Sequence, residues 1–182
     1  MPVQLLSIIK NLYHDDEYIL VDGDKEVHVR PARGVKQGCP LSPLLFSLYI
    51  NDIPSVADGL QGAVTGSEGM QVSHLLYADD LTLLSNRPDQ LQSMLKKLAS
   101  YARKKCLTVN TKKSVVVHLN SGGGNEPTFF YEDQPLNAVD TFVYLGVLFC
   151  KTLNRTAAAD HAIKPMMAST FRVQQFVREH KL

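Results

Sequence analysis

The chain has 182 residues, of which 45% are hydrophobic and 20% charged, and its formal net charge is +1. This length and composition indicate one globular domain with a core of its own. Its three cysteines are far apart, which argues against a disulfide framework or a zinc site and fits a reducing intracellular compartment. The apolar runs are too short for a membrane span, and the absence of a signal-peptide core argues against secretion.

The first fifty residues predict two helices separated by a hairpin. Apolar residues recur at helical spacing from Val3 to Tyr13. Tyr18–Val21 and Val27–Val29 flank a glycine-containing turn and predict a β-hairpin. Gly34–Pro40 is expected to form a loop, after which Ser42, as N-cap with a proline in the first turn, opens a second helix.

The middle of the chain predicts a loop, a hairpin and a long helix. Residues 57–70 are polar with glycines, which is typical of a connecting loop. Two apolar runs, 74–76 and 81–84, flank the sequence Tyr-Ala-Asp-Asp and predict a second hairpin. Pro88 begins a helix with an apolar face, and short strands are expected at Leu107–Val109 and Ser114–Leu119.

The last third predicts a flexible loop, a strand and a helix. Ser121–Asn125 is rich in glycine and is expected to form a loop. Thr141–Phe149 is apolar and is expected to form a strand with Gly146 inside it. An amphipathic helix is expected from about Ala157 to Arg178, kinked or divided by Pro165.

Asp79 and Asp80 lie at the tip of the hydrophobic hairpin. Two adjacent carboxylates repel each other and resist desolvation, and an uncharged turn would close the same hairpin at lower cost. Divalent cations would neutralise the pair, and Mg²⁺ prefers hard oxygen ligands together with substrate phosphates. The pair therefore predicts a two-metal phosphoryl-transfer centre, the alternative being a plain exposed turn.

The charges are unevenly distributed along the chain. Residues 1–60 carry five basic and eight acidic side chains, whereas residues 90–125 carry seven basic side chains and no acidic one. A basic surface beside an acidic centre suits a polyanion held near metal ions, although a solvated helix face would have the same composition.

Four segments together resemble a known family. Arg33–Phe46 is similar to the B motif of reverse transcriptases, and Tyr77–Asp80 is similar to their C motif. The sequence Cys-Pro-Leu-Ser-Pro within the first segment is most similar to non-LTR (LINE-type) retrotransposons. Leu107–Ser114 resembles the D motif, except that Cys106 stands where the family usually has glycine, and Phe142–Gly146 resembles the E motif. The resemblance implies an α/β (α+β) fold of the polymerase palm type, an antiparallel sheet with helices on one face.

The resemblance also implies roles for individual residues. Asp79 and Asp80 would be catalytic ligands of Mg²⁺ or Mn²⁺, the second aspartate often being less essential in the family. Lys113 would stand near the triphosphate as a candidate proton donor to pyrophosphate. An ordinary surface lysine at that position is the alternative.

Two glycine-containing segments would approach the nucleic acid. The template and the incoming nucleotide would contact Gly34, Gln37, Gly38 and Pro40. The primer grip would consist of Tyr144, Leu145 and Gly146, unless Gly146 only marks a bulge. The cysteines at 39 and 106 are expected to be small buried residues, not reactive thiols.

One carboxylate of the family's metal site has no counterpart here. The A motif precedes the B motif by a helix and a hairpin, so this chain is expected to begin just after it. Four aspartates at positions 15, 16, 22 and 24 do not follow an apolar strand in the family's order and are not expected to replace it. Residues 1–150 are thus expected to be a partial palm and residues 151–182 the beginning of a helical thumb.

Three functions are compatible with these features. The chain is a fragment of an RNA-directed DNA polymerase, inactive alone and binding metal weakly through two carboxylates; or a non-catalytic RNA-binding, protein-binding or structural subunit; or half of a split polymerase. An RNA template and a DNA primer are the expected partners by family, in the nucleus or cytoplasm, or in an organelle. An unpaired sheet edge also predicts a protein or RNA partner that covers it.

Overall fold

A computed structural model of the chain describes residues 2–14, 16–65, 69–119 and 126–152, together with residues 156, 159–161 and 163. The chain divides into two compact units, Met1–Asn51 and Asp52–Leu182, which are described separately. Helices and strands are mixed in both units, so the α+β content predicted from the sequence is confirmed.

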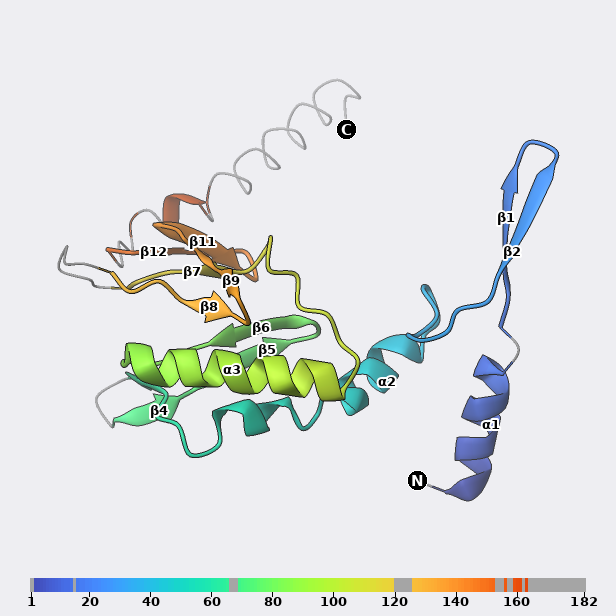
Figure 1. Cartoon of the computed structure of the whole chain (residues 1–182), viewed down its shortest axis with the longest axis horizontal. Helices are drawn as coiled ribbons and strands as arrows, with labels where there is room; N and C mark the ends of the chain where they lie inside the picture. Colours follow the sequence, from blue (N-terminus) through green and yellow to red (C-terminus); the bar gives the residue numbers. More distant parts are fainter. Residues whose placement is uncertain are drawn as a thin grey trace, which may run out of the picture. The chain divides into compact units, whose positions relative to one another are not determined.

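The first unit contains two helices and one hairpin, labelled in Figure 1. Helix α1 spans Val3–Tyr13, strands β1 and β2 span Tyr18–Asp22 and Lys25–Val29, and helix α2 spans Ser42–Tyr49. The two strands pair antiparallel around a turn at Gly23, which has φ of 60°. These elements match the sequence predictions, but none of the described residues of α1, β1 or β2 is buried.

The start of α2 differs from its prediction. Ser42 is the first residue of the helix, and the N-cap is Leu41, which makes no side-chain capping bond. The Ser42 hydroxyl donates instead to the main-chain carbonyl of Lys36 at 2.6 Å. Ser42 is buried, and this hydrogen bond connects the preceding loop to the helix. The side chain therefore stabilises the loop and does not cap the helix.

The second unit is built around helix α3, which spans Pro88–Lys104 (Figure 1). The short 3₁₀-helix η1, Ile53–Ala57, contacts α3, as does strand β8. The strands form two-stranded pairs, antiparallel except for β7 with β10. Their bounds are β3 Ala63–Thr65, β4 Met70–Val72, β5 His74–Tyr77, β6 Asp80–Leu83, β7 Val115–Val116, β8 Phe130–Tyr131, β9 Gln134–Pro135, β10 Asn137–Ala138, β11 Thr141–Tyr144 and β12 Val147–Cys150.

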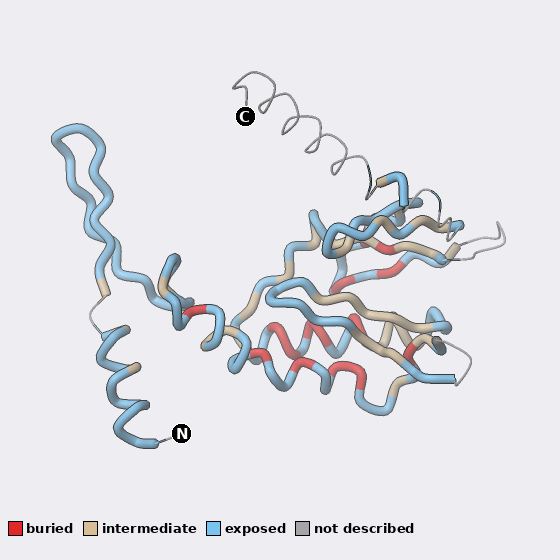
Figure 2. The backbone as a smooth tube through the Cα atoms, turned by 180° about the vertical axis from the view of Figure 1, so that it is seen from behind, coloured by how far each residue is buried: buried red, intermediate tan, exposed pale blue. Residues whose placement is uncertain are grey.

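The core lies on one side of α3. Leu95, Leu98 and Ala99 join Val56 of η1 and Phe129 in a single buried cluster. Figure 2 shows the buried residues of this unit gathered along the helix and the segments beside it. The apolar face predicted for residues 88–102 is therefore the face that the rest of the unit covers, and most of the lysines lie elsewhere on the helix.

Four predictions for this unit differ from the structure. The expected loop at residues 57–70 contains β3 and the start of β4. The expected strand Leu107–Val109 is irregular, and the one expected at Ser114–Leu119 is reduced to two residues. Thr141–Phe149 is a hairpin, not one strand, because Gly146 lies in the turn with φ of 80°.

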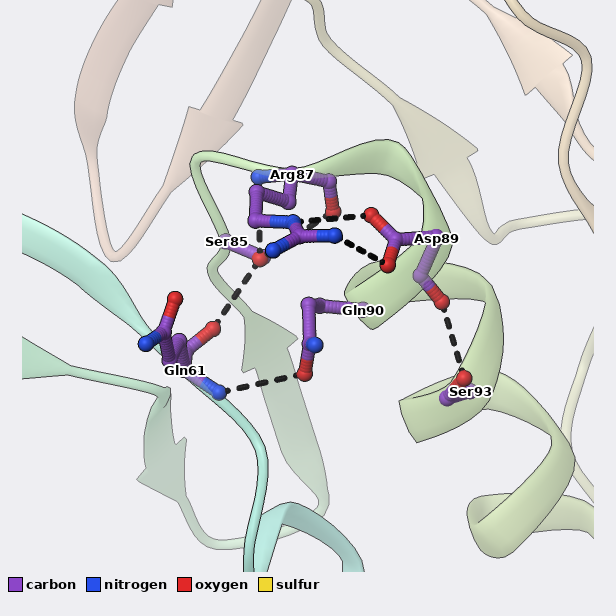
Figure 3. A network of polar contacts seen from close by, with 6 residues as sticks. All are labelled: Gln61, Ser85, Arg87, Asp89, Gln90 and Ser93. Atoms are coloured by element: carbon purple, nitrogen blue, oxygen red, sulfur yellow. Dashed lines mark hydrogen bonds and ion pairs between the residues drawn. The ribbon is translucent and has the colours of Figure 1, made fainter.

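Figure 3 shows the polar network that joins the end of β6 to the start of α3. The Ser85 hydroxyl donates to the backbone carbonyl of Gln61 at 3.0 Å, and the backbone N–H of Gln61 donates to the side-chain oxygen of Gln90 at 3.2 Å. Arg87 bonds both carboxylate oxygens of Asp89, at 3.1 and 2.8 Å, which lowers the Asp89 pKa. The network fixes the position at which the chain leaves the hairpin and enters the helix.

The glycine-rich loop Ser121–Asn125 and most of the helix predicted from Ala157 to Arg178, including Pro165, lie outside the described residues. The domain boundary at residue 150 and the thumb assignment therefore stay predictions. Among the described helices, none combines the length and the apolar character needed to cross a membrane.

Candidate active site

The aspartate pair lies on a regular hairpin. Strands β5 and β6 pair antiparallel, with Tyr77 opposite Asp80, so Ala78 and Asp79 form a two-residue turn. Asp80 is therefore the first residue of β6 and only Asp79 belongs to the turn. Side chains alternate along a strand, which places Asp80 and Tyr77 on one face and Leu81 on the other.

The two faces of this hairpin have different surroundings. Leu81 and Leu83 pack against the core cluster that includes α3. Tyr77, on the opposite face with Asp80, is 62% exposed. The hairpin thus turns its apolar face to the helix and presents the Asp80 carboxylate on the open face.

The backbone is strained at the turn. Ala78 has φ of 51°, in the left-handed region. An L-residue in this region costs about 1–2 kcal/mol relative to a right-handed conformation. Strain of this kind, held next to polar groups by surrounding structure, is a common feature of functional sites. It lies directly before the two carboxylates.

Both carboxylates are exposed, which differs from the expectation from sequence. Asp79 and Asp80 are in contact with water, so their predicted desolvation is not found in this chain. Within the described residues neither makes an ion pair or a side-chain hydrogen bond. The donor set consists of hard, negatively charged oxygens and suits Mg²⁺ or Mn²⁺.

No third ligand accompanies the pair among the described residues, where no group of three or more His, Cys, Asp and Glu side chains converges. Asp22 and Asp24 flank the turn of the β1–β2 hairpin in the first unit. Asp16 forms an ion pair with Lys36 at 2.6 Å, and the remaining candidate, Asp15, lies outside the described residues.

The loop that resembles the B motif is held by contacts within the first unit. Lys36 pairs with Asp16, which raises the Lys36 pKa, and its amino group lies 5.4 Å from the centre of the Tyr13 ring. The Tyr13 hydroxyl lies 3.3 Å from that of Ser42, which donates to the Lys36 carbonyl. Sequence patterns did not predict this clamp of Tyr13, Asp16 and Lys36, because no short-range pattern links residues twenty or more positions apart.

The clamped loop leaves its predicted site residues accessible. Gln37, Gly38 and Pro40 are exposed, and Gly34 and Gly38 have φ of 102° and 79°, which favour glycine. A side chain added at Gly38 would meet no atom within 4 Å. The glycine is therefore required by backbone conformation, and free space adjoins it.

Cys39, in the same loop, is half-buried, and the Leu41 backbone N–H lowers its thiol pKa. Cys106 is exposed, which contradicts its predicted burial. It has φ of 51° immediately after α3, where a glycine would adopt the conformation without strain.

The other predicted site residues lie on turns of the second unit. Lys113 is exposed in a tight turn in which its backbone N–H donates to the Asn110 carbonyl at 3.1 Å. Tyr144 pairs with Val147 at the end of the β11–β12 hairpin. Leu145 and Gly146 form its turn, both with positive φ, so Gly146 marks a hairpin turn and not a bulge.

The structure brings together only part of the predicted set. Asp79 and Asp80 are adjacent, and the second unit also carries Lys113 and the turn at Leu145. Within the described residues, no hydrogen bond or ion pair connects these groups to one another. The loop at residues 34–40 belongs to the first unit.

Comparison with known sequences identifies the family. The family model described as reverse transcriptase (RNA-dependent DNA polymerase) matches residues 2–149. This chain belongs to the reverse transcriptase family. The match contains the aspartate hairpin, the clamped loop and the Leu145 turn, so all the predicted site residues fall within the reverse transcriptase region.

Its relatives include polymerases of non-LTR retrotransposons. The reverse transcriptase chain is 28% identical over 156 residues to a Pol polyprotein from the type-1 retrotransposable element R2 of Popillia japonica, covering 81% of the chain and 25% of that protein. It is 31% identical to the type-2 element R2DM polyprotein of Drosophila melanogaster (83% and 15%) and 27% identical to the jockey RNA-directed DNA polymerase of Drosophila funebris (82% and 17%). The chain thus spans a quarter or less of these relatives' length.

Proposed function

We propose that this chain contributes the B to E motifs of an RNA-directed DNA polymerase and that Asp79 and Asp80 hold its divalent cations. One observation carries the proposal: two exposed carboxylates without ionic partners follow a strained turn inside the region that matches the reverse transcriptase model. The name of one relative, an RNA-directed DNA polymerase, supports DNA synthesis directed by RNA. In this proposal the hairpin pairs belong to a polymerase palm.

The carboxylates would act by holding cations at a fixed place on the hairpin. A bound divalent cation would lower the pKa of the primer 3′-hydroxyl and stabilise the charge of the leaving pyrophosphate. The Asp80 side chain is oriented by the strand and that of Asp79 by the turn. Since the apolar face of β6 is anchored to the core, the pair needs little rearrangement to bind a cation.

The other residues would position the substrates. The space beside Gly38 would admit the backbone of the template or the incoming nucleotide, with Gln37 and Pro40 at its border. Lys113, exposed and without an ionic partner among the described residues, would serve the triphosphate. The Leu145–Gly146 turn would meet the primer.

A third carboxylate ligand would have to come from a segment other than this hairpin, which provides only two. Two carboxylates alone do not bridge two cations about 3.5–4 Å apart. The 182-residue chain is therefore expected to bind Mn²⁺ weakly and to show no primer extension on an RNA template with Mg²⁺. Extension that disappears in Asp79→Ala would overturn this part of the proposal. A non-catalytic subunit or half of a split polymerase would share the inactivity.

Cation binding can be tested without activity. Mn²⁺ is expected to broaden the amide resonances of residues 78–80 in the wild-type chain and not in Asp79→Asn/Asp80→Asn. The double variant Asp22→Asn/Asp24→Asn is a matched control, since it removes two carboxylates from the turn of another exposed hairpin. Equal loss of broadening in both double variants, or in neither, would contradict the assignment.

A further inference from the structure

Helix α3 has a second face that the core does not use. Positions 96, 97, 100 and 104 lie together at helical spacing on the side of the helix away from the buried Leu95 and Leu98. This basic face consists of Lys96, Lys97, Ser100 and Lys104, all of them exposed. Lys97 and Lys104 are seven residues apart, or about 10.5 Å along the axis.

A small open depression lies at the start of this face. Its volume is about 280 Å³. That volume is at the lower limit of the sites that hold drug-sized ligands, which measure roughly 300–1,000 Å³. Two lysines and three hydroxyl-bearing residues are among the residues that line it. The lining residues are Ser55, Val56, Lys96, Lys97, Ser100 and Tyr101.

The lysines of the basic face are not paired with acidic side chains within the described residues, unlike their neighbours on the helix. Arg103 pairs with Glu132 at 3.2 Å and Lys105 with Asp52 at 2.9 Å. Lys96, Lys97 and Lys104 form no ion pair within the part of the chain that the structure describes. Lys97 donates to the main-chain carbonyl of Asp58, which restrains its ammonium group without neutralising it.

The composition of the face favours one class of partner. A protein partner requires apolar or aromatic anchors at the centre of its interface. Here the apolar lining residues, Val56 and Tyr101, are 2% and 9% exposed, and the Tyr101 hydroxyl already donates to Asp52 at 2.7 Å. What remains accessible is a set of cations and hydroxyls, which complements phosphate groups.

We propose that the basic face of α3 binds the phosphate backbone of a single-stranded nucleic acid, with two neighbouring phosphates held at the depression, one by Lys96 and the other by Lys97. The face is separate from the proposed metal site. The β5–β6 hairpin packs on the core side of α3 through Leu81 and Leu83, whereas the lysines point to the opposite side. The phosphates bound here would therefore not be those at the Asp80 carboxylate.

Salt dependence gives the proposal a magnitude. For a single strand, the logarithm of the affinity falls with the logarithm of the salt concentration with a slope of roughly −0.7 per phosphate contacted. Loss of two contacts should make the slope shallower by about 1.4. At 0.1 M salt this corresponds to about 25-fold weaker binding, if counterion release is the whole effect.

The test measures binding of a fluorescent 20-nucleotide RNA to the full 182-residue chain by anisotropy, between 50 and 200 mM salt. Lys96→Gln/Lys97→Gln is expected to bind about 25-fold more weakly at 0.1 M, with the shallower slope. The control, Lys10→Gln/Lys25→Gln, makes the same change of charge at exposed positions of the first unit and is expected to keep the wild-type slope. Equal effects in both variants, or no RNA binding by the wild type, would overturn the proposal.

Two further measurements distinguish a nucleic acid from an acidic protein at this face. Acetylation of surface lysines, read by mass spectrometry, should fall at Lys96 and Lys97 of the wild-type chain when RNA is added and stay constant at Lys10. Poly-glutamate at equal charge should compete poorly, and displacement as effective as by RNA would indicate an acidic protein partner instead. Because Mn²⁺ binding at Asp79 does not involve this face, either proposal can fail without the other.

Discussion

Replacing Cys106 by glycine tests whether the end of α3 is strained. Cys106 follows the last turn of the helix with φ of 51°. Its N–H donates to the Arg103 carbonyl at 3.2 Å, and the Leu107 N–H donates to the Ala102 carbonyl at 2.8 Å. These are the two bonds of a Schellman motif, whose left-handed position is usually glycine.

The expected gain follows from two opposing terms. Removing the Cβ from a left-handed residue relieves about 1–2 kcal/mol. Glycine has more freedom in the unfolded chain, which costs roughly 0.5–1 kcal/mol. The thiol is exposed, so little packing is lost. Cys106→Gly should therefore raise the free energy of unfolding by about 0.5–1 kcal/mol, or the Tm by roughly 1–4 °C for a chain of this length.

Thermal and urea unfolding under reducing conditions, followed by far-ultraviolet circular dichroism, would measure the change. Cys106→Ala is the matched control, because it removes the sulfur and keeps the Cβ in the same conformation. It should leave the free energy of unfolding unchanged within a few tenths of a kcal/mol. If alanine stabilised the chain as much as glycine, the backbone-strain argument would be refuted and the thiol itself would be the cause.

Three other predictions use the same unfolding measurements. Gly62→Ala should destabilise the chain by about 1–3 kcal/mol, because the new Cβ would lie 2.5 Å from the Val72 carbonyl carbon, and an unchanged midpoint would mean that the backbone moves freely there. Leu145→Asn should raise stability by up to about 1 kcal/mol, since asparagine tolerates the left-handed turn, and a decrease would show that leucine packing is the larger effect. The hydrogen bond from the Tyr101 hydroxyl lowers the Asp52 pKa, so the ionised Asp52 stabilises the folded chain. This stabilisation is complete above the ordinary Asp pKa of 3.8 and is lost as the pH falls through the lowered pKa of the folded chain. Asp52→Asn should therefore flatten the pH dependence of the free energy of unfolding below pH 4, and an unaltered pH profile would contradict this prediction.

Local sequence patterns predicted the parts of the fold that depend on local interactions. Helix α1 was predicted with the bounds it has, and the long helix from Pro88 was predicted from its apolar spacing. The aspartate hairpin followed from two apolar runs around a short polar break. In each case the pattern repeats every two residues or at helical spacing, so the information lies within one segment.

Predictions failed where tertiary contacts decide the local structure. Ser42 looks like an N-cap, but the carbonyl of Lys36 takes its hydroxyl. Residues 63–65 look like loop, but pair with residues 70–72, and Gly62 adjoins the backbone of Val72 so closely that only glycine fits. Cys106 was predicted to be a small buried residue because free cysteines usually are, whereas it is exposed and has a left-handed backbone directly after α3.

The candidate site shows the same division between local and long-range information. The sequence predicted Asp79 and Asp80 as a pair of site residues because they lie in one short motif. The glycines of the loop at residues 34–38 were predicted for the same reason. The clamp formed by Tyr13, Asp16 and Lys36 was missed, since its members are brought together only by the fold. Motif residues indicate which chemistry a site can perform, and the residues that hold them are found only in the structure.

The left-handed residues connect stability to the proposed chemistry. Ala78, Cys106, Glu132 and Leu145 have positive φ without being glycine. At about 1–2 kcal/mol each, they oppose folding by an amount comparable with the whole stability of a typical domain, about 5–15 kcal/mol. The strain at Cys106 lies at a helix end, far along the chain from either carboxylate, and its relief should affect stability alone. The strain at Ala78 is different, because a Cβ there allows the turn fewer conformations than glycine would. If the pair holds a cation as proposed, that restriction would limit the motion of Asp79 and Asp80 beforehand, and less ordering would remain to oppose binding.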